Sequence, residues 1–388
     1  MRDTVADAAA RLRASLTLAS EGLIEREALV EQIALAAVAR EHVLVIGPPG
    51  TAKSEAVRRV SAVLGGRYFE YLLGRFTEPG EIFGPVDLRR LREGVLAVET
   101  QGMLPEAEVA FLDEVFLGST AILNTLLGVL NERRYRRGVT SVACPLRVCV
   151  GASNALPDEE GLGAFADRFL VRVFLDPVPD PRLEDLLAGG WQGRASARRE
   201  AAPGLMSDLD RLSEAVRGVD LEPVRASLAH AVRLLRRVQV TLSDRRAVRV
   251  QNLVAAAAVM AGRTVASEED LWPLVIAVPT REEQATARTA LRELLARSRN
   301  ATLGAAVEEA SAGPLARADR ITRDADALFA DAASTIEPTP SAGPDRREGL
   351  QLRAEGLLRE IDAGFPPGAV PSDLLTVRQR IIERWGMR

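Results

Sequence analysis

A loop rich in glycine and proline, placed between an apolar run and an amphipathic segment, constrains this chain more than any other feature. His42–Ile46 is short, apolar and rich in β-branched residues, which predicts a buried strand. Gly47–Gly50 predicts a loop, and Ser54–Leu64 has the periodicity of a helix. In such a strand–loop–helix unit, backbone N–H groups point inward and the helix N-terminus adds partial positive charge. The unit therefore predicts a phosphate site.

The residues of this loop match a Walker A nucleotide-binding pattern with one departure, because the pattern expects glycine where Ala52 stands. Alanine is the smallest substitution, so the backbone can still approach a phosphate closely. Lys53 would reach the β- and γ-phosphates of ATP, and Ser54 would bind Mg²⁺. The expected nucleotide-binding residues are Gly47, Pro48, Pro49, Gly50, Thr51, Ala52, Lys53 and Ser54.

The alternative to a nucleotide site is a glycine-proline loop that merely precedes a core helix. The basic residues argue against this alternative. Lys53 is the sole lysine of the chain, and the other 49 of its 50 basic residues are arginines. A lysine retained at this position indicates a need for a compact ammonium on a flexible stem.

A second apolar run, Val109–Leu112, ends in two acidic residues, as a Walker B strand does. Asp113 would hold Mg²⁺, mostly through water, and Glu114 would orient and deprotonate the attacking water. An ordinary strand-to-helix turn with two solvated acids is the alternative. The Walker A loop upstream favours the catalytic interpretation.

Asn154 comes after another predicted buried strand, Leu146–Val150. An asparagine in this position can hydrogen-bond the γ-phosphate or the attacking water. The alternative is a turn residue before Pro157.

Two arginine positions are candidates for contact with the transferring phosphate. Arg168 lies between aromatic residues, and from a neighbouring subunit it would stabilise the charge of the transition state. A surface ion pair with Asp167 is the alternative. Arg245 lies in the first turn of a predicted helix and could reach back to the nucleotide, as could Arg246. In a chain with so many arginines, each single one is weak support.

The rest of the chain predicts further elements from its periodicity and turn residues. Helices are expected at 4–19, 25–40, 121–131, 281–297, 315–333, 346–363 and 372–385. A further buried strand is expected at 171–175, and 335–345 is expected to be a Pro-rich linker or loop.

Composition limits the classes of function. A net charge of −4 argues against a non-specific nucleic-acid or anionic-membrane binder. The longest apolar run, Leu253–Ala261, is far short of the roughly 20 residues of a membrane helix. The N-terminus has no apolar signal-peptide core, and two cysteines cannot form a disulfide framework. We expect a cytoplasmic protein without membrane contact.

Together these motifs resemble the AAA+ ATPases, specifically the MoxR group and its RavA branch. GPPGTAKS is similar to the Walker A loop of that group, including the alanine before the lysine. The stretch LLGRFTEPGEIFGPVDL at 72–88 looks like the RavA branch. FLDEV, followed by AILNTLLGVLNERRYRRG, is similar to the same branch. The resemblance covers residues 20–280 and does not clearly extend to 281–388.

The resemblance implies an α/β fold, an AAA+ three-layer αβα P-loop domain with a helical lid and a C-terminal helical extension. The nucleotide-binding domain with its N-terminal helices would span 1–178, the lid 179–280 and the extension 281–388. A hairpin at 135–143 and an insertion within 75–98 would interrupt the first domain. The segment Leu23–Glu25, and so Ile24 and Glu25, would hold the adenine.

The resemblance also implies an ATPase that works as a ring, usually a hexamer. Asn154 would be sensor 1, Arg168 the finger that acts in trans, and Arg245 sensor 2. Members of the family often remodel or assemble protein complexes together with von Willebrand factor A (VWA) domain proteins. We therefore expect a homo-oligomeric, chaperone-like, Mg²⁺-dependent ATPase with a VWA-domain partner and a protein client.

Two other functions are compatible with the motifs. A nucleic-acid-handling AAA+ ATPase is opposed by the acidic balance and by the lack of a zinc-finger or helix-turn-helix signature. A nucleotide-gated scaffold with little hydrolysis is opposed by the intact Asp113, Glu114 and Asn154.

Overall fold

The computed structural model describes residues 4–157, 160–179, 182–195, 204–312, 314–334, 344–364 and 370–386. The chain forms two compact units. The first contains residues 1–177 and 196–311, and the second contains 178–195 and 312–388. The boundaries at 178 and 280 separate the expected nucleotide-binding domain, lid and extension, and they stay a prediction. Most of the Pro-rich linker predicted at 335–345 lies outside the described residues.

A five-stranded parallel sheet, ordered β2-β3-β6-β1-β7, is the centre of the first unit. Its strands are β1 Val43–Ile46, β2 Tyr68–Leu72, β3 Val109–Asp113, β6 Val148–Ser153 and β7 Val171–Phe174. The strands predicted at 42–46, 109–112 and 171–175 are confirmed, and the one predicted at 146–150 begins two residues later. β2 was not predicted, because it is only partly buried and carries Glu70 at its centre.

Side chains that alternate along the strands enter two separate cores, so the sheet is the middle of three layers. Val43 and Val45 of β1 join one apolar cluster, while Leu44 and Ile46 join the other. Parallel strands covered on both faces are expected to be apolar throughout, and β1 is buried at all of its positions. The predicted layered α/β fold is therefore confirmed.

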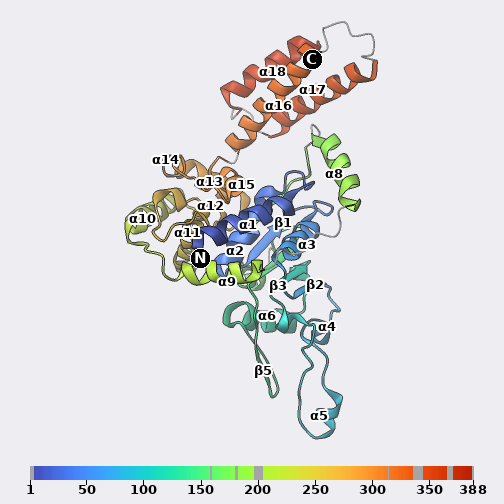
Figure 1. The fold of residues 1–388 in the computed structure, drawn as a ribbon, viewed down its shortest axis with the longest axis vertical. Coiled ribbons are helices and arrows are strands. Elements are labelled where there is room, and N and C mark those ends of the chain that lie inside the picture. Colours follow the sequence, from blue (N-terminus) through green and yellow to red (C-terminus); the bar gives the residue numbers. More distant parts are fainter. Residues whose placement is uncertain are drawn as a thin grey trace. The chain divides into compact units, whose positions relative to one another are not determined.

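Helices of the first unit surround this sheet (Figure 1). The helices predicted at 4–19, 25–40, 54–64 and 121–131 are confirmed, although α2 begins only at Glu27. The single helix expected over 281–297 is divided at Leu291. The helices are α1 Val5–Ser20, α2 Glu27–Ala39, α3 Lys53–Leu64, α4 Pro79–Phe83, α5 Leu88–Arg92, α6 Thr120–Glu132, α7 Glu160–Ala166, α9 Leu205–Val216, α10 Glu222–Arg237, α11 Asp244–Met260, α12 Pro273–Ile276, α13 Arg281–Ala290, α14 Arg292–Leu295 and α15 Gly304–Ser311.

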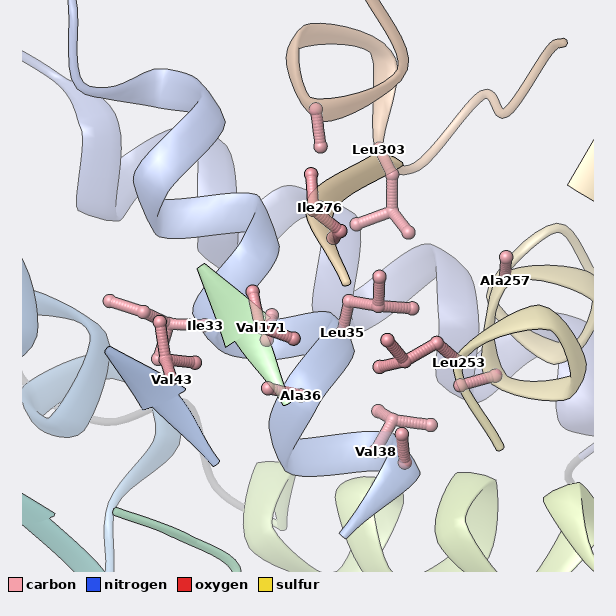
Figure 2. Packing of buried hydrophobic residues seen from close by; sticks show 14 of the residues in the cluster. Ile33, Leu35, Ala36, Val38, Val43, Val171, Leu253, Ala257, Ile276 and Leu303 are labelled. Carbon is pink, nitrogen blue, oxygen red and sulfur yellow. The ribbon is translucent and has the colours of Figure 1, made fainter. Parts of the chain in front are cut away.

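The last two turns of helix α2 are almost entirely apolar and are buried on all sides. Every residue from Gln32 to Ala39 is buried. A helix of this kind needs partners around its whole circumference. It contacts β1 and β7 of the sheet and also α1, α9, α11 and α15. Figure 2 shows Ile33 beside Val43 of β1, with other α2 side chains directed toward Leu253 of α11. One helix therefore joins the sheet and the later helices into one core.

A short hairpin and a longer insertion leave the first unit on the same side (Figure 1). The hairpin predicted at 135–143 is confirmed as β4 Arg134–Arg137 and β5 Thr140–Ala143. The insertion contains α4 and α5. The segment that returns from α5 contacts the hairpin turn, where the Val139 N–H donates to the Leu96 carbonyl (3.1 Å). Gly138 is required in this turn, since its φ is +57° and a Cβ there would lie 2.5 Å from the Leu96 oxygen.

The second unit contains α8 Leu183–Ala195 and three further helices, α16 Pro314–Ser334, α17 Pro344–Gly364 and α18 Ser372–Trp385. The last three confirm the helices predicted at 315–333, 346–363 and 372–385, and α8 was not predicted. Helices α16, α17 and α18 share their own apolar core, which includes Ile321, Leu357 and Ile381. Among the described residues, no helix of either unit is long and apolar enough to span a membrane.

The carboxylate of Glu31, on α2, caps the start of α15. Its Oε2 accepts the N–H of Ala306 (2.7 Å). Burial raises the pKa of Glu31 from 4.5 to about 7, although backbone hydrogen bonds from Ala306 and Ala305 oppose the shift. Because the pKa is higher in the folded state, the stability contribution is complete below pH 4.5 and is lost as the pH rises through 7.

The free energy of unfolding of the wild type should fall by about 2 to 3 kcal/mol between pH 4.5 and 7.5, relative to Glu31→Gln. Glutamine keeps the acceptor for α15 but does not titrate. Chemical unfolding of both proteins over this pH range measures the difference, and other ionisable groups cancel in the comparison. Equal pH slopes for the two proteins would contradict the prediction.

Candidate functional site

The candidate site lies where three parallel strands end. Ile46 of β1 is paired with Ser153 of β6, and Leu112 of β3 is paired with Gly151 of β6. The residues that follow these strands therefore meet at one edge of the sheet. In open α/β sheets this carboxyl edge is where ligands bind. The structure thus brings the Walker A loop, Asp113–Glu114 and Asn154 together, as the sequence predicted.

The Walker A loop has an open backbone between two fixed ends. At its start, Gly47 packs against the chain after β7, where a Cβ would lie 2.8 Å from the Leu175 oxygen. At its end, the Thr51 hydroxyl donates to the Pro48 carbonyl (2.9 Å). Gly50 has a φ of +80°, and a Cβ there would meet nothing within 4 Å. Pro48, Pro49 and Gly50 are exposed, so the loop backbone is accessible to a phosphate.

Ala52 has a left-handed backbone, with φ +61° and ψ +25°. This conformation explains why glycine is the usual residue here, since a Cβ in the left-handed region costs about 1 to 2 kcal/mol. Ala52 immediately precedes the first residue of α3. The loop keeps its shape at the expense of local strain, as is common at functional sites.

Lys53, Asn154 and Glu114 form a connected polar cluster. The Lys53 ammonium, in a residue that is 8 % exposed, donates to the Gly47 carbonyl (2.6 Å) and the Pro48 carbonyl (3.1 Å). It also lies 3.5 Å from Oδ1 of Asn154. The Asn154 amide in turn donates to Glu114 Oε1 (2.7 Å). Burial lowers the pKa of Lys53, while Asp113 and Glu114 oppose the shift. The cluster places a cation, an amide and a carboxylate beside the loop.

Oxygen atoms suited to Mg²⁺ border the same cluster. Ser54 lies half-buried in the first turn of α3, and Asp113 is half-buried at the end of β3. Hydroxyl and carboxylate oxygens are ligands that Mg²⁺ accepts. The Glu114 N–H donates to Asp113 Oδ1 (3.0 Å), and Glu114 has a φ of +48°. This left-handed turn directs the Glu114 side chain toward Asn154, while Asp113 stays at the strand end.

Arg26 is a site residue that sequence reasoning missed. It is 5 % exposed and adjoins the segment expected to hold adenine, in which Ile24 and Glu25 are half-buried. Its guanidinium donates to three backbone carbonyls, those of Thr51 (2.8 Å), Glu25 (2.6 Å) and Asp176 (2.7 Å). Burial lowers the pKa of Arg26, whereas neighbouring carboxylates oppose the shift. Arg26 thus ties the adenine segment to the phosphate loop and to the chain after β7.

The sequence carried no signal for Arg26. Its acceptors are backbone carbonyls, which exist at every residue and leave no pattern of side chains. One arginine among 49 also attracts no notice.

Among the described residues, no hydrogen bond or ion pair joins Arg168 or Arg245 to the Lys53 cluster. Arg168 is half-buried in the turn between α7 and β7. The ion pair considered as its alternative role is not formed, because Asp167 pairs with Arg246 (3.0 Å). Arg245 is exposed in the first turn of α11, whereas Arg246 is 1 % exposed.

All three side-chain nitrogens of Arg246 donate hydrogen bonds inside the protein. Besides Asp167, its guanidinium donates to the carbonyls of Ala277 (2.9 Å), Phe169 (3.3 Å) and Leu170 (2.6 Å). Burial lowers its pKa, and Asp167 opposes the shift. Of the two neighbouring candidates for contact with the nucleotide, only Arg245 has an exposed side chain.

Two family models match successive parts of this chain. A family model described as the MoxR domain in the MoxR-vWA-beta-propeller ternary systems matches residues 10–214, and one for an AAA lid domain matches residues 223–288. Two uncharacterized proteins of Methanocaldococcus jannaschii, MJ0079 and MJ0812, are each 34% identical to this chain, over 250 and 254 residues. Each match covers 64% of this chain, and the chain spans 64% and 66% of the two relatives.

Two more distant similarities agree with these. Chaperone MoxR1 of Mycobacterium tuberculosis is 27% identical over 167 residues, which are 42% of this chain and 44% of that protein. A solved structure of a proposed ATPase from Cytophaga hutchinsonii aligns with 76% of this chain and 97% of its own, with a TM-score of 0.59. At 14% identity, this structure shows a shared fold alone.

The left-handed backbone of Ala52 predicts that glycine at this position stabilises the protein. Ala52→Gly should raise the free energy of unfolding by about 1 kcal/mol, because glycine adopts the left-handed region without the Cβ clash. The matched control is Ala62→Gly, at an exposed position in the body of α3. It should lower stability by about 1 kcal/mol. Chemical denaturation measures both, and a loss of stability in Ala52→Gly would show that the loop is not strained.

Proposed function

The chain belongs to the family of MoxR domains described for MoxR-vWA-beta-propeller ternary systems, and from this premise we propose that it hydrolyses ATP between the subunits of a ring. Its fold is the three-layer αβα P-loop fold of AAA+ proteins with a helical lid. The observation that carries the proposal is the cluster of Lys53, Asn154 and Glu114 beside an open Walker A loop.

The proposed roles follow from where each side chain lies. Mg²⁺–ATP, when bound, supplies the phosphoanhydride bond and a divalent charge that neutralises its phosphates. Lys53 would donate to phosphate oxygens in place of its carbonyl acceptors, and Ser54 with Asp113 would hold Mg²⁺. Glu114 accepts a proton from the attacking water. Asn154, which already donates to Glu114, keeps that carboxylate facing the loop.

The adenine end of the site follows from the position of Arg26. We assign Ile24 and Glu25 to the adenine because they adjoin Arg26, which is bonded to the Walker A loop. Arg26 is then a positioning residue that fixes the distance between the base and the phosphates. The backbone of Glu25, with a φ of +59°, supports a tight turn at this point.

The arginines complete the site from two directions. Arg245 is the proposed contact to the nucleotide of its own chain, since Arg246 is buried among carbonyl acceptors. Arg168 is the proposed finger for the neighbouring subunit, because it precedes β7, at the edge of the parallel sheet opposite the Walker A loop, and forms no ion pair with Asp167. A closed ring, as a hexamer, gives every site such a neighbour.

The proposed work is the remodelling or assembly of protein complexes. The matched family is described for systems that also contain vWA and beta-propeller parts, and one relative carries the name chaperone. We therefore propose a VWA-domain partner and a protein client. The similarity of residues 72–88 to the RavA branch also remains part of the proposal.

Three substitutions test the composite site. Lys53→Ala should abolish ATP binding, because it removes the cation that faces the phosphates. Glu114→Gln should bind ATP normally and lose about 10²- to 10⁴-fold in turnover. Arg168→Ala should bind ATP and lose about 10³-fold in turnover of the assembled form. Phosphate release, ATP binding and particle mass by mass photometry are measured on the same samples with Mg²⁺.

Arg225→Ala is the matched control, an exposed arginine of α10 paired with Glu222 one turn away. It should leave turnover unchanged. An assembled particle that binds ATP without hydrolysing it would replace the proposal by a nucleotide-gated scaffold. Turnover that is independent of assembly, or unaffected by Arg168→Ala, would remove the interface from the proposal.

A further inference from the structure

Helix α11 holds the segment that carries Arg168. Arg246, in its first turn, donates to the carbonyls of Phe169 and Leu170 and pairs with Asp167. The residues on both sides of Arg168 are therefore fixed by one buried guanidinium.

Arg249, one turn further along α11, contacts Arg168 itself. Its Nη2 donates to the Arg168 carbonyl (3.1 Å) and also to the buried carboxylate of Glu41. Glu41 is 3 % exposed and accepts a second hydrogen bond, from Asn252 Nδ2 (3.0 Å). Glu41 directly precedes His42 and β1, so the contact anchors the Arg168 turn to the base of the central sheet.

The side chain of Arg168 depends on these backbone contacts. Its Nε is buried and has no hydrogen-bond partner among the described residues. No hydrogen bond from Nε therefore fixes this side chain, so its position depends on the turn that carries it. Both contacts of Arg249 leave from the same nitrogen, Nη2, which lies one atom further from the backbone than the ammonium of a lysine. Arg249→Lys therefore keeps the charge but ends short of the two acceptors.

We propose that Arg249, together with Arg246, is a positioning residue that fixes Arg168 for the nucleotide bound by the neighbouring subunit. The inference rests on the proposed function, in which Arg168 acts in trans. α11 then carries the proposed contact to the chain's own nucleotide, Arg245, and the supports of the residue that completes the next site. Misplacing a catalytic group by 1 Å costs on the order of 10²-fold in rate, so this support is large enough to matter.

Mixed assemblies of two full-length chains test the proposal. One chain, Glu114→Gln, supplies Arg168 but cannot turn over its own ATP. The other chain, Arg168→Ala, has an intact site but no finger. Mixing them creates sites in which an intact Glu114 faces an intact Arg168, and turnover should recover there. Arg249→Lys is then added either to the finger-supplying chain or to the site-supplying chain.

In the finger-supplying chain, Arg249→Lys should lower the recovered turnover about tenfold or more. In the site-supplying chain it should change turnover by less than about twofold, and ATP binding should be unchanged in both placements. Asn252→Ala is the matched control, because it removes the other α11 contact to Glu41 without touching the Arg168 turn. It should have no effect in either chain.

Each outcome bears on a different claim. Equal losses in both placements would show that Arg249 merely stabilises the fold and would overturn the inference. Loss only in the site-supplying chain would assign Arg249 to its own nucleotide site instead. No recovery on mixing the two parent chains would overturn the composite site of the proposed function, and the inference would fall with it.

Discussion

The burial of the last two turns of α2 is the constraint on which the rest of the first unit depends. Residues Gln32–Ala39 have no solvent-facing side, so the chain must bring helices from distant parts of the sequence to cover them. α9, α11 and α15 supply this cover, and the sheet supplies the other side. Because α2 leads directly into β1 and the Walker A loop, the packing that buries it also fixes the loop in place.

The chemistry at the sheet edge depends on register and on local strain. Pairing of β1, β3 and β6 sets the ends of the strands side by side, so that Glu114 and Asn154 meet without any long loop. Ala52 and Glu114 both adopt left-handed backbones, which non-glycine residues seldom do. Strain of this kind persists only where the surrounding structure holds it, and here it shapes the loop and directs the carboxylate.

Arginines join segments that are far apart along the chain, mostly through backbone carbonyls. Arg26 joins the segment before α2 to the Walker A loop, Arg246 joins α11 to the turn before β7, and Arg249 joins the same turn to Glu41. A planar guanidinium with five donors suits this use, because it can bridge several acceptors at once. The arginine-rich composition therefore supplies internal supports, and the single lysine is kept beside the Walker A loop.

Local patterns in the sequence were enough to predict the layered α/β fold, the Walker A loop and the strand ends that carry Asp113, Glu114 and Asn154. These features are local, since apolar runs, glycine positions and terminal acids leave a pattern within a few residues. The exposure of Arg245 and the burial of Arg246 could be read only from the folded chain, as could the positions of Arg26 beside the Walker A loop and of Arg249 against the Arg168 turn. Their partners are carbonyls and carboxylates far along the chain, and the sequence has no periodicity that records such contacts. The edge strand β2 was missed for a related reason, because its half-buried YFEYL takes its place in the sheet from pairing with β3.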